Sequence, residues 1–258
     1  MEKVRSADGT EIAFDRLGDG PPVVLVSGAS CTRAVHAPLA GLLAAEFTVL
    51  NHDRRGRGGS GDTAPYTVER EIEDLDALIG AAGGSAALFG NSSGAVLALR
   101  AAAAGLPVTR LALWEPPFML DPDAPRRQWE YASRLAELLG AGRRGDAMAL
   151  FMATVGLPGE MVETMRRAPM WPELEALAHT LAYDAAVMGD GTLPPGLISS
   201  VKAPVLVLHG TGTGSWTGEM ARALTAALPD ARSQVLEGQS HDVDWEVLAP
   251  ALRGFLME

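Results

Sequence analysis

Residues 86–99 read AALFGNSSGAVLAL, which is a short apolar run, a turn of small residues and an Ala/Leu-rich segment in succession. The apolar run is typical of a strand that is buried on both faces of a parallel sheet. The Ala- and Leu-rich segment favours a helix. Between the two, Gly90, Ser92 and Gly94 fit the pattern G-x-S-x-G, which requires a strand before it and a helix after it. The stretch therefore predicts a sharp strand-to-helix turn with Ser92 at its apex.

This turn needs glycine at both ends for a steric reason. A side chain at Gly90 or Gly94 would clash as the chain passes abruptly from the strand into the helix. Ser92 then stands above the sheet, at a helix N-terminus whose dipole and free N–H groups favour negative charge. The alternative interpretation is a Gly/Ser-rich turn into a helix with no chemical role.

The segments on either side repeat the alternation of strand and helix signals. Strands are expected at 11–16, 23–26, 47–50, 85–89, 108–114, 205–208 and 232–236. Helices are expected between them at 33–46, 67–82, 94–104, 217–228 and 244–256. Only helical signals occur from about 116 to 201, with helices expected at 124–140, 145–155, 159–167 and 172–187. The pattern implies one α/β domain with a parallel sheet, interrupted by an all-helical insertion.

The composition is that of a globular protein and excludes several functional classes. Of the 258 residues, 47% are hydrophobic and 21% are charged, which is unlike a disordered chain. The net charge of −11 argues against nucleic acid or an anionic membrane as a partner. The single cysteine, Cys31, excludes an internal disulfide framework and a multi-cysteine metal site. We expect no metal and no cofactor.

Targeting signals are not expected in this sequence. Residues 1–14 lack the apolar segment of a secretory signal, and no run reaches the ~18 uninterrupted apolar residues of a membrane span. We expect a cytoplasmic protein that acts on a small molecule, as a monomer or a homodimer.

Further motifs accompany the turn in a fixed order. Residues 53–60 read DRRGRGGS, and residues 238–241 read GQSH after the last expected strand. Together with the G-x-S-x-G turn and the helical insertion, these motifs make the chain resemble the α/β-hydrolase fold family over nearly its whole length. The resemblance implies a mostly parallel sheet of about eight strands flanked by helices, with an all-helical cap inserted after the sixth strand. It divides the chain into a core domain at 1–116 and 202–258 and a cap at 117–201.

The resemblance also implies roles for individual residues. Ser92 corresponds to the nucleophile, and His241 corresponds to the general base that takes its proton. The backbone N–H groups of Ala29 and Ser93 correspond to the oxyanion hole. Many members carry a histidine where this chain has Ser27, but a backbone N–H acts in that loop, so Ala29 can still donate.

The carboxylate partner of His241 is the point at which this chain departs from many members. They carry an aspartate shortly after the seventh strand, where Thr213 stands here. Glu115, at the end of the strand that follows the turn and its helix, is the best substitute, because the carboxyl ends of neighbouring parallel strands meet at one crevice. We expect Glu115 within hydrogen-bonding distance of His241, roughly 2.6–3.2 Å. Asp242 and Asp244 are weaker candidates, since residues so close to His241 rarely fold back onto its ring.

A serine at the apex indicates acyl transfer, because fold members that form an alkyl ester on the enzyme carry an aspartate there. We therefore expect a hydrolase that cleaves a small to medium, mostly apolar ester, lactone or thioester through an acyl-enzyme on Ser92. A helical cap over the crevice makes an apolar pocket the default, and the cap is expected to be the more mobile part. The candidate substrate contacts are Ser27, Met119, Trp171 and Trp216.

Two other classes of function remain open. The relocated acid and Ser27 keep a non-hydrolytic enzyme in view, such as a lyase or cyclase in secondary metabolism that acts on a natural-product intermediate. A ligand receptor with residual turnover is the second alternative, since fold does not decide function. The other histidines are expected to have packing or surface roles; they are His36, His52, His179 and His209. The alternatives are that His36 lines the pocket and that His179, in the cap, contacts the substrate.

Overall fold

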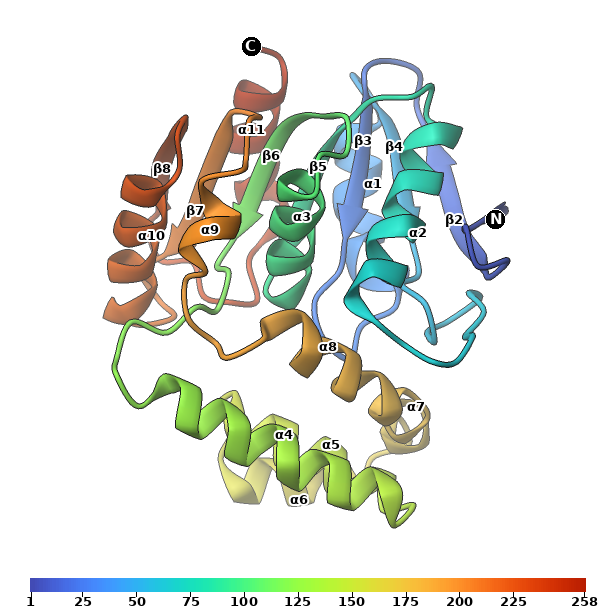
Figure 1. The fold of residues 1–258 in the computed structure, drawn as a ribbon, viewed down its shortest axis with the longest axis vertical. Helices are drawn as coiled ribbons and strands as arrows, with labels where there is room; N and C mark the ends of the chain where they lie inside the picture. Colours follow the sequence, from blue (N-terminus) through green and yellow to red (C-terminus); the bar gives the residue numbers. More distant parts are fainter.

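Eight strands form one sheet in the order β1-β2-β4-β3-β5-β6-β7-β8, in a computed structural model that describes residues 1–258 (Figure 1). The strands β1 and β2, and likewise β2 and β4, pair antiparallel, whereas all other neighbours run parallel. The mostly parallel, eight-stranded sheet predicted from the sequence is thereby confirmed. The strands are β1 (Glu2–Arg5), β2 (Glu11–Leu17), β3 (Pro22–Val26), β4 (Thr48–His52), β5 (Ala86–Asn91), β6 (Val108–Trp114), β7 (Val205–Gly210) and β8 (Ala231–Leu236).

Helices flank both faces of the sheet and fill the long connection between β6 and β7. Those outside this connection are η1 (Arg33–His36), α1 (Ala37–Leu43), α2 (Val68–Ala81), α3 (Ser93–Ala103), α10 (Ser215–Ala227) and α11 (Trp245–Leu256). Those within it are α4 (Ala124–Gly140), α5 (Arg144–Thr154), α6 (Gly159–Arg166), α7 (Trp171–Leu177), η2 (Ala178–Thr180), α8 (Leu181–Met188) and α9 (Pro195–Ile198).

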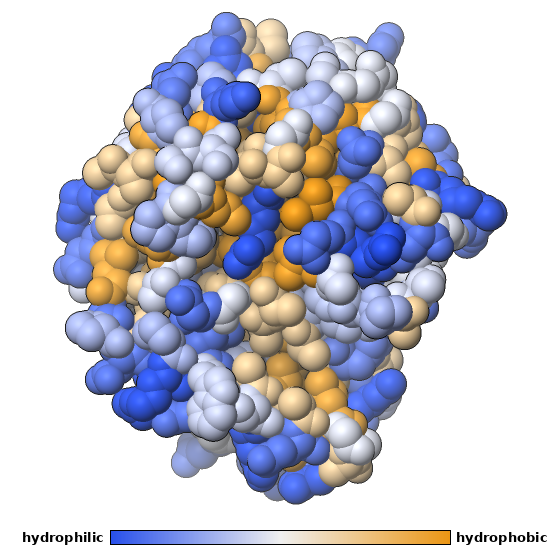
Figure 2. All heavy atoms as spheres, viewed as in Figure 1, coloured by the Kyte–Doolittle hydropathy of each residue, from blue (hydrophilic) through white to orange (hydrophobic).

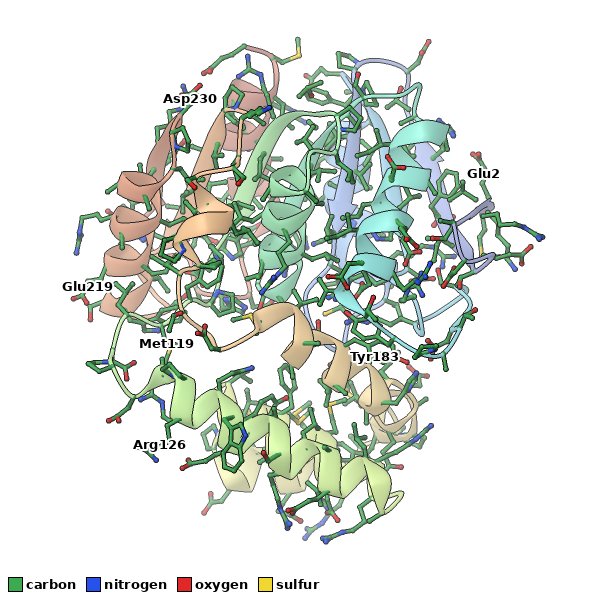
Figure 3. The ribbon with its side chains drawn as sticks, viewed as in Figure 1. Glu2, Met119, Arg126, Tyr183, Glu219 and Asp230 are labelled. Atoms are coloured by element: carbon green, nitrogen blue, oxygen red, sulfur yellow. The ribbon has the colours of Figure 1, made fainter.

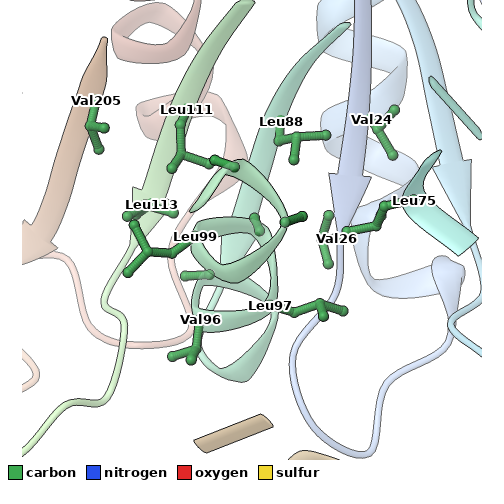
Figure 4. Packing of buried hydrophobic residues seen from close by; sticks show 14 of the residues in the cluster. Val24, Val26, Leu75, Leu88, Val96, Leu97, Leu99, Leu111, Leu113 and Val205 are labelled. Atoms are coloured by element: carbon green, nitrogen blue, oxygen red, sulfur yellow. The ribbon is translucent and has the colours of Figure 1, made fainter. Parts of the chain in front are cut away.

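Successive residues of the central strands face opposite sides of the sheet, so each strand contributes to two cores. In β3, Val24 and Val26 pack in one cluster with α2, α3 and α10, whereas Val23 and Leu25 pack in the other with α1 and α11. Figure 4 shows the first cluster, in which side chains of α3 lie against those of β5 and β6. Burial of each such side chain contributes about 1.5–3 kcal/mol, which explains why these strands are continuously apolar.

The connection between β6 and β7 contains only helices, in the place where the sequence predicts the insertion. Figure 1 shows α4, α5 and α6 beyond the carboxyl ends of the parallel strands, with α8 between them and the sheet. These helices have a core of their own, which includes Leu135, Met148 and Trp171. The insertion therefore lies at the edge where the loops that follow the strands emerge.

Parts of the chain differ from the sequence-based expectation. The strand β1 has an EKVR sequence that is charged and largely exposed, so its pattern does not reveal it. The helix expected at 172–187 is divided into α7, η2 and α8. The break lies at Thr180, whose hydroxyl donates to the Leu177 carbonyl at 2.8 Å and so competes with the helical hydrogen bonds. The helix expected at 33–46 begins as η1 and continues as the shorter α1, and α9 forms where none is expected.

More than half of the large apolar side chains that are exposed belong to the connection between β6 and β7, where Trp129 is 70% exposed. On the face shown in Figure 2, apolar residues gather toward the middle and hydrophilic residues surround them. None of the helices combines the length with the apolar character that a membrane span needs.

Candidate active site

The turn between β5 and α3 holds Ser92 in a conformation that few residues adopt. The backbone angles of Ser92 are φ 55° and ψ −129°. A Cβ added at Gly90 would lie 2.4 Å from the carbonyl oxygen of Gly94, and one at Gly94 would lie 2.3 Å from that of Val26. Only glycine fits at either position, because both obstacles are backbone atoms that cannot move away. The steric reason predicted for the two glycines is therefore confirmed.

Backbone strain gathers at one edge of the sheet. The non-glycine residues with a left-handed φ are Ser30, Ser92 and Glu115, at 54°, 55° and 43°. They follow β3, β5 and β6, which are neighbours in the sheet. Each such conformation costs about 1–3 kcal/mol and persists only where the surroundings impose it, which is typical of functional sites. The carboxyl edge of these strands is thereby marked as the candidate site.

His241 and Glu115 meet across 126 positions of the sequence, with Glu115 Oε2 at 2.7 Å from His241 Nδ1. The contact expected from the sequence is present. Glu115 is fully buried, whereas the His241 side chain is 46% exposed. Oε1 of Glu115 accepts a hydrogen bond from the Gly210 N–H at 3.0 Å, and Oε2 accepts a second one from the Thr213 hydroxyl at 3.0 Å. Thr213 thus helps to hold the Glu115 carboxylate.

The backbone of the loop that carries His241 is held by a hydrogen bond from the end of β6. The indole N–H of Trp114, which precedes Glu115, donates to the His241 carbonyl oxygen at 3.1 Å. The same strand end therefore holds both the backbone and the ring of His241. With Nδ1 engaged by the carboxylate, Nε2 is the ring nitrogen available to accept a proton.

Ser92 lies against the loop after β3. A Cβ at Gly28 would lie 3.1 Å from the Cβ of Ser92, and the Gly28 N–H donates to the Asn91 side chain at 3.1 Å. The structure contains no hydrogen bond between Ser92 and His241. Such contacts are often long in a site without substrate and shorten when substrate binds.

Two backbone N–H groups flank Ser92 without a protein acceptor. They belong to Ala29 and Ser93, the residues expected to form the oxyanion hole. Ser93 is the first residue of α3, and N–H groups in the first turn of a helix have no partner within the helix. An anion bound there would also benefit from the helix dipole. Both donors are therefore free, and their role in catalysis stays a prediction.

The arginine-rich loop after β4 is buried and fully paired with acids, which sequence analysis did not predict. All three arginines are at most 1% exposed. The ion pairs are Arg54 with Glu71 and Asp184, Arg55 with Asp74 and Asp8, and Arg57 with Asp184. The sequence signal that could have indicated this network is the run of arginines directly after an apolar strand, because buried arginines need acidic partners. The partner on α8, however, lies more than 120 residues away along the chain.

Asp184 remains charged in this setting. Burial pushes the pKa of its carboxyl up, but the guanidinium groups of Arg57 and Arg54 outweigh burial and lower the pKa below its usual value. The same balance holds for Glu71, whose pKa is lowered by Arg54 against the effect of burial. The buried network thus combines two guanidinium groups with two carboxylates.

The residues expected to contact substrate lie in different surroundings. Met119, which Figure 3 shows on the link to α4, and Trp216 are 40% and 39% exposed. Ser27 is fully buried, and its hydroxyl has no hydrogen-bond partner. Trp171 is 7% exposed within the core of the insertion, and its indole N–H donates to Glu175 at 2.9 Å. Trp171 thus contributes packing, and substrate contact at all four positions stays a prediction.

The remaining reactive groups lack the surroundings of a catalytic centre. Burial lowers the pKa of both His36 and His52 to about 4, so these side chains are neutral at pH 7. Burial raises the pKa of the Cys31 thiol, which disfavours the thiolate. No group of three or more His, Cys, Asp or Glu side chains has the arrangement of a metal site.

Comparison with known proteins identifies relatives over most of the chain. A family model described as "Alpha/beta hydrolase family" matches residues 23–252. A crystal structure of an alpha/beta hydrolase from Sphaerobacter thermophilus is 53% identical, with a TM-score of 0.89 over 98% of this chain and 99% of that one. A malate-bound thermophilic esterase from Thermogutta terrifontis is 25% identical, with a TM-score of 0.74 over 99% and 97% of the two chains.

A further relative is much longer than this chain. Polyketide synthase ThaQ from Burkholderia thailandensis is 30% identical over 97% of this chain. The match spans only 12% of the length of that protein. The similarity therefore concerns one segment of a large enzyme.

Proposed function

This chain belongs to the alpha/beta hydrolase family and is a hydrolase, and on that premise we propose that it cleaves a small to medium, mostly apolar ester, lactone or thioester through an acyl-enzyme on Ser92. The observation that carries the proposal is the contact of 2.7 Å between Glu115 and His241. It supplies a paired imidazole at the same sheet edge as a serine in a strained strand-to-helix turn.

The first half of the reaction forms the acyl-enzyme. Ser92 Oγ attacks the carbonyl carbon of the substrate while His241 Nε2 takes its proton. The carbonyl oxygen becomes an oxyanion and accepts hydrogen bonds from the N–H groups of Ala29 and Ser93. When the carbonyl re-forms, the bond to the leaving group breaks, and His241 returns the proton to the departing alcohol or thiol.

The second half releases the acid and restores the enzyme. A water molecule gives a proton to His241 and attacks the acyl carbon, and the Ser92 oxygen leaves and recovers that proton. In both halves the charged imidazole is stabilised by the carboxylate of Glu115, which also fixes Nδ1 as the protonated nitrogen.

The apolar substrate class is supported by the insertion. Residues 117–201 act as a cap over the crevice, and the cap carries exposed apolar side chains such as Met119 and Trp129. Residues 1–116 and 202–258 form the core that carries the catalytic groups. The similarity to an esterase agrees with an ester bond as the cleaved group.

A second candidate is a biosynthetic enzyme that does not hydrolyse its substrate, such as a lyase or cyclase. The similarity to a segment of a polyketide synthase favours it, because that protein is named as a synthase. This candidate needs the crevice and His241 but no acyl-enzyme.

Labelling with a fluorophosphonate separates the two candidates. We expect stoichiometric labelling of Ser92 by mass spectrometry, because the reagent reacts with an activated serine. Ser92→Ala should lose labelling and lower the kcat for short-chain p-nitrophenyl esters by about 10⁴–10⁶-fold, with little change in melting temperature. Ser85→Ala, at the exposed residue that precedes β5, is the matched control and should keep full activity.

A lack of labelling in the wild-type protein would contradict the acyl-enzyme and favour the lyase or cyclase. Labelling with a single turnover and no sustained ester hydrolysis would instead favour a ligand receptor.

A further inference from the structure

A carboxylate from the insertion contacts one side of the expected oxyanion hole directly and the other side through Arg57. Asp184 lies on α8, and its Oδ1 accepts a hydrogen bond from the Ser93 hydroxyl at 2.8 Å. Its Oδ2 accepts one from Nη2 of Arg57 at 2.8 Å. Nη1 of Arg57 in turn donates to the carbonyl oxygen of Gly28 at 2.6 Å. Asp184 and Arg57 together thus connect the loop after β3 with the start of α3.

The contact to the Gly28 carbonyl fixes the direction of the Ala29 N–H. The two groups belong to one peptide unit, which is planar and trans, so they point in opposite directions. When Arg57 holds the oxygen, the N–H is aimed to the opposite side and cannot rotate independently. The planar guanidinium group provides two donors in a fixed geometry, which suits it to bridge Asp184 and this oxygen.

The other donor, the Ser93 N–H, belongs to a residue whose side chain is bound to Asp184. The Ser93 hydroxyl is bound to Asp184, and Ser93 itself is 3% exposed. Arg54 strengthens this side, since its Nη1 donates to Asp184 Oδ1 at 2.7 Å and to the Ser27 carbonyl at 3.2 Å. The residues that supply the two oxyanion donors are therefore linked to the same carboxylate.

We propose that Asp184 and Arg57 are positioning residues that hold the N–H groups of Ala29 and Ser93 in the geometry of the oxyanion hole. The inference rests on the proposed function, because it requires an oxyanion next to Ser92. The buried group contains two guanidinium groups and two carboxylates, so it acts through geometry and not through a net charge. Donors that are fixed before the reaction stabilise the transition state more than they stabilise the substrate.

Steady-state kinetics of Arg57→Gln and Asp184→Asn test the proposal, with a p-nitrophenyl ester as substrate. We expect kcat to fall by about 10–100-fold with KM within twofold, since loss of a whole donor costs about 10²–10³-fold. The affinity for a trifluoromethyl ketone, to which the serine adds to give a tetrahedral oxyanion, should fall by the same factor. If these residues acted in folding alone, the folded variants would bind the inhibitor as tightly as the wild type does. They would also show no loss of kcat at constant KM.

The matched control is Arg55→Gln. Arg55 lies in the same loop, is also fully buried and pairs with Asp74 and Asp8, but it contacts neither oxyanion donor. We expect this variant to have a lower melting temperature and a kcat within twofold of the wild type. If Arg57→Gln or Asp184→Asn does not fold, Arg57→Lys and Ser93→Ala replace them, each with an expected kcat loss of about 3–10-fold.

Three results would overturn the inference. The first is that folded Arg57 and Asp184 variants keep a kcat within twofold of the wild type. The second is that Arg55→Gln loses as much kcat as those variants do. The third is a loss of kcat without a weaker trifluoromethyl ketone complex. Failure of the proposed function is distinguishable, because the wild-type enzyme would then neither bind the ketone tightly nor be labelled by the fluorophosphonate.

Discussion

At the scale of single residues, the pairing of Glu115 with His241 is the most informative feature. Glu115 reaches His241 from β6, and Thr213 donates a hydrogen bond to the same carboxylate oxygen. Glutamate has a longer side chain than aspartate, and Glu115 adopts a left-handed φ of 43°. The strained residue is thereby kept in place by three contacts, to Gly210, Thr213 and His241.

We expect Glu115→Gln to lower kcat by about 10³–10⁴-fold, because an amide neither stabilises the imidazolium nor fixes its tautomer. The variant keeps the volume of the side chain, so KM should change little. Glu219→Gln is the control, since Glu219 is an exposed acid on α10 (Figure 3). The kcat of this variant should remain within twofold of the wild type.

Adding Thr213→Asp to Glu115→Gln should recover part of the lost turnover, because it restores a carboxylate near His241. Full activity of Glu115→Gln would show that another group supports His241.

At the scale of elements, α8 differs from the helices further out in the insertion. Tyr183 of α8 stacks on Tyr66 with ring centroids 3.8 Å apart, and Arg100 of α3 donates to the Val187 carbonyl at 2.7 Å. With the ion pairs of Asp184, these contacts fix α8 to the core, whereas Figure 1 shows α4, α5 and α6 farther from the sheet. The mobility expected of the insertion from the sequence should therefore be confined to these outer helices.

Hydrogen exchange tests this division. Amides of α4, α5 and α6 should exchange faster than those of α8, because opening of α8 breaks buried ion pairs. In Asp184→Asn, exchange in α8 should accelerate while exchange in β5 stays slow. Equal protection of α8 and the outer helices in the wild type would argue against the division.

Local patterns explain which elements the sequence predicts well. The central strand β3 and the second half of β6 are apolar on both faces. The helix expected at 124–140 coincides with α4 because its pattern is continuous. The charged edge strand β1 lacks such a pattern. Ser92 is recognisable as a candidate because its motif is local, and Glu115 is recognisable as a candidate because it follows a strand expected beside the motif. Asp184 escapes prediction, since its arginine partners are 127 and 130 positions away and only the folded chain brings them together.

At the scale of the whole molecule, two buried histidines link stability to pH. His36 and His52 are at most 1% exposed, and burial lowers the pKa of each to about 4, with Arg54 acting in the same direction on His52. In the unfolded chain each takes up a proton near pH 6.5, so between pH 6.5 and 4 only the unfolded state is protonated. The free energy of unfolding should therefore decrease as the pH falls through this window.

We expect each histidine to contribute a loss of about 2 kcal/mol between pH 7 and pH 5, measured by urea denaturation. His36→Gln should be less stable at pH 7 but should show a shallower dependence on pH. His179→Gln is the control, because His179 is more exposed and lies beside Asp62. A pH dependence that is unchanged in His36→Gln would disprove the contribution of this residue.

The ion pairs of Asp184 also limit how freely this protein can be recombined with its relatives. Replacing 117–201 by the corresponding segment of another enzyme would remove one carboxylate from two buried guanidinium groups, Arg54 and Arg57. Breaking a buried pair in this way costs about 3–5 kcal/mol, which is a large part of the stability of a domain. The insertion is thus not an interchangeable module. A chimera that exchanges it for new specificity has to carry over an acid at the place of Asp184, or change the arginines with it.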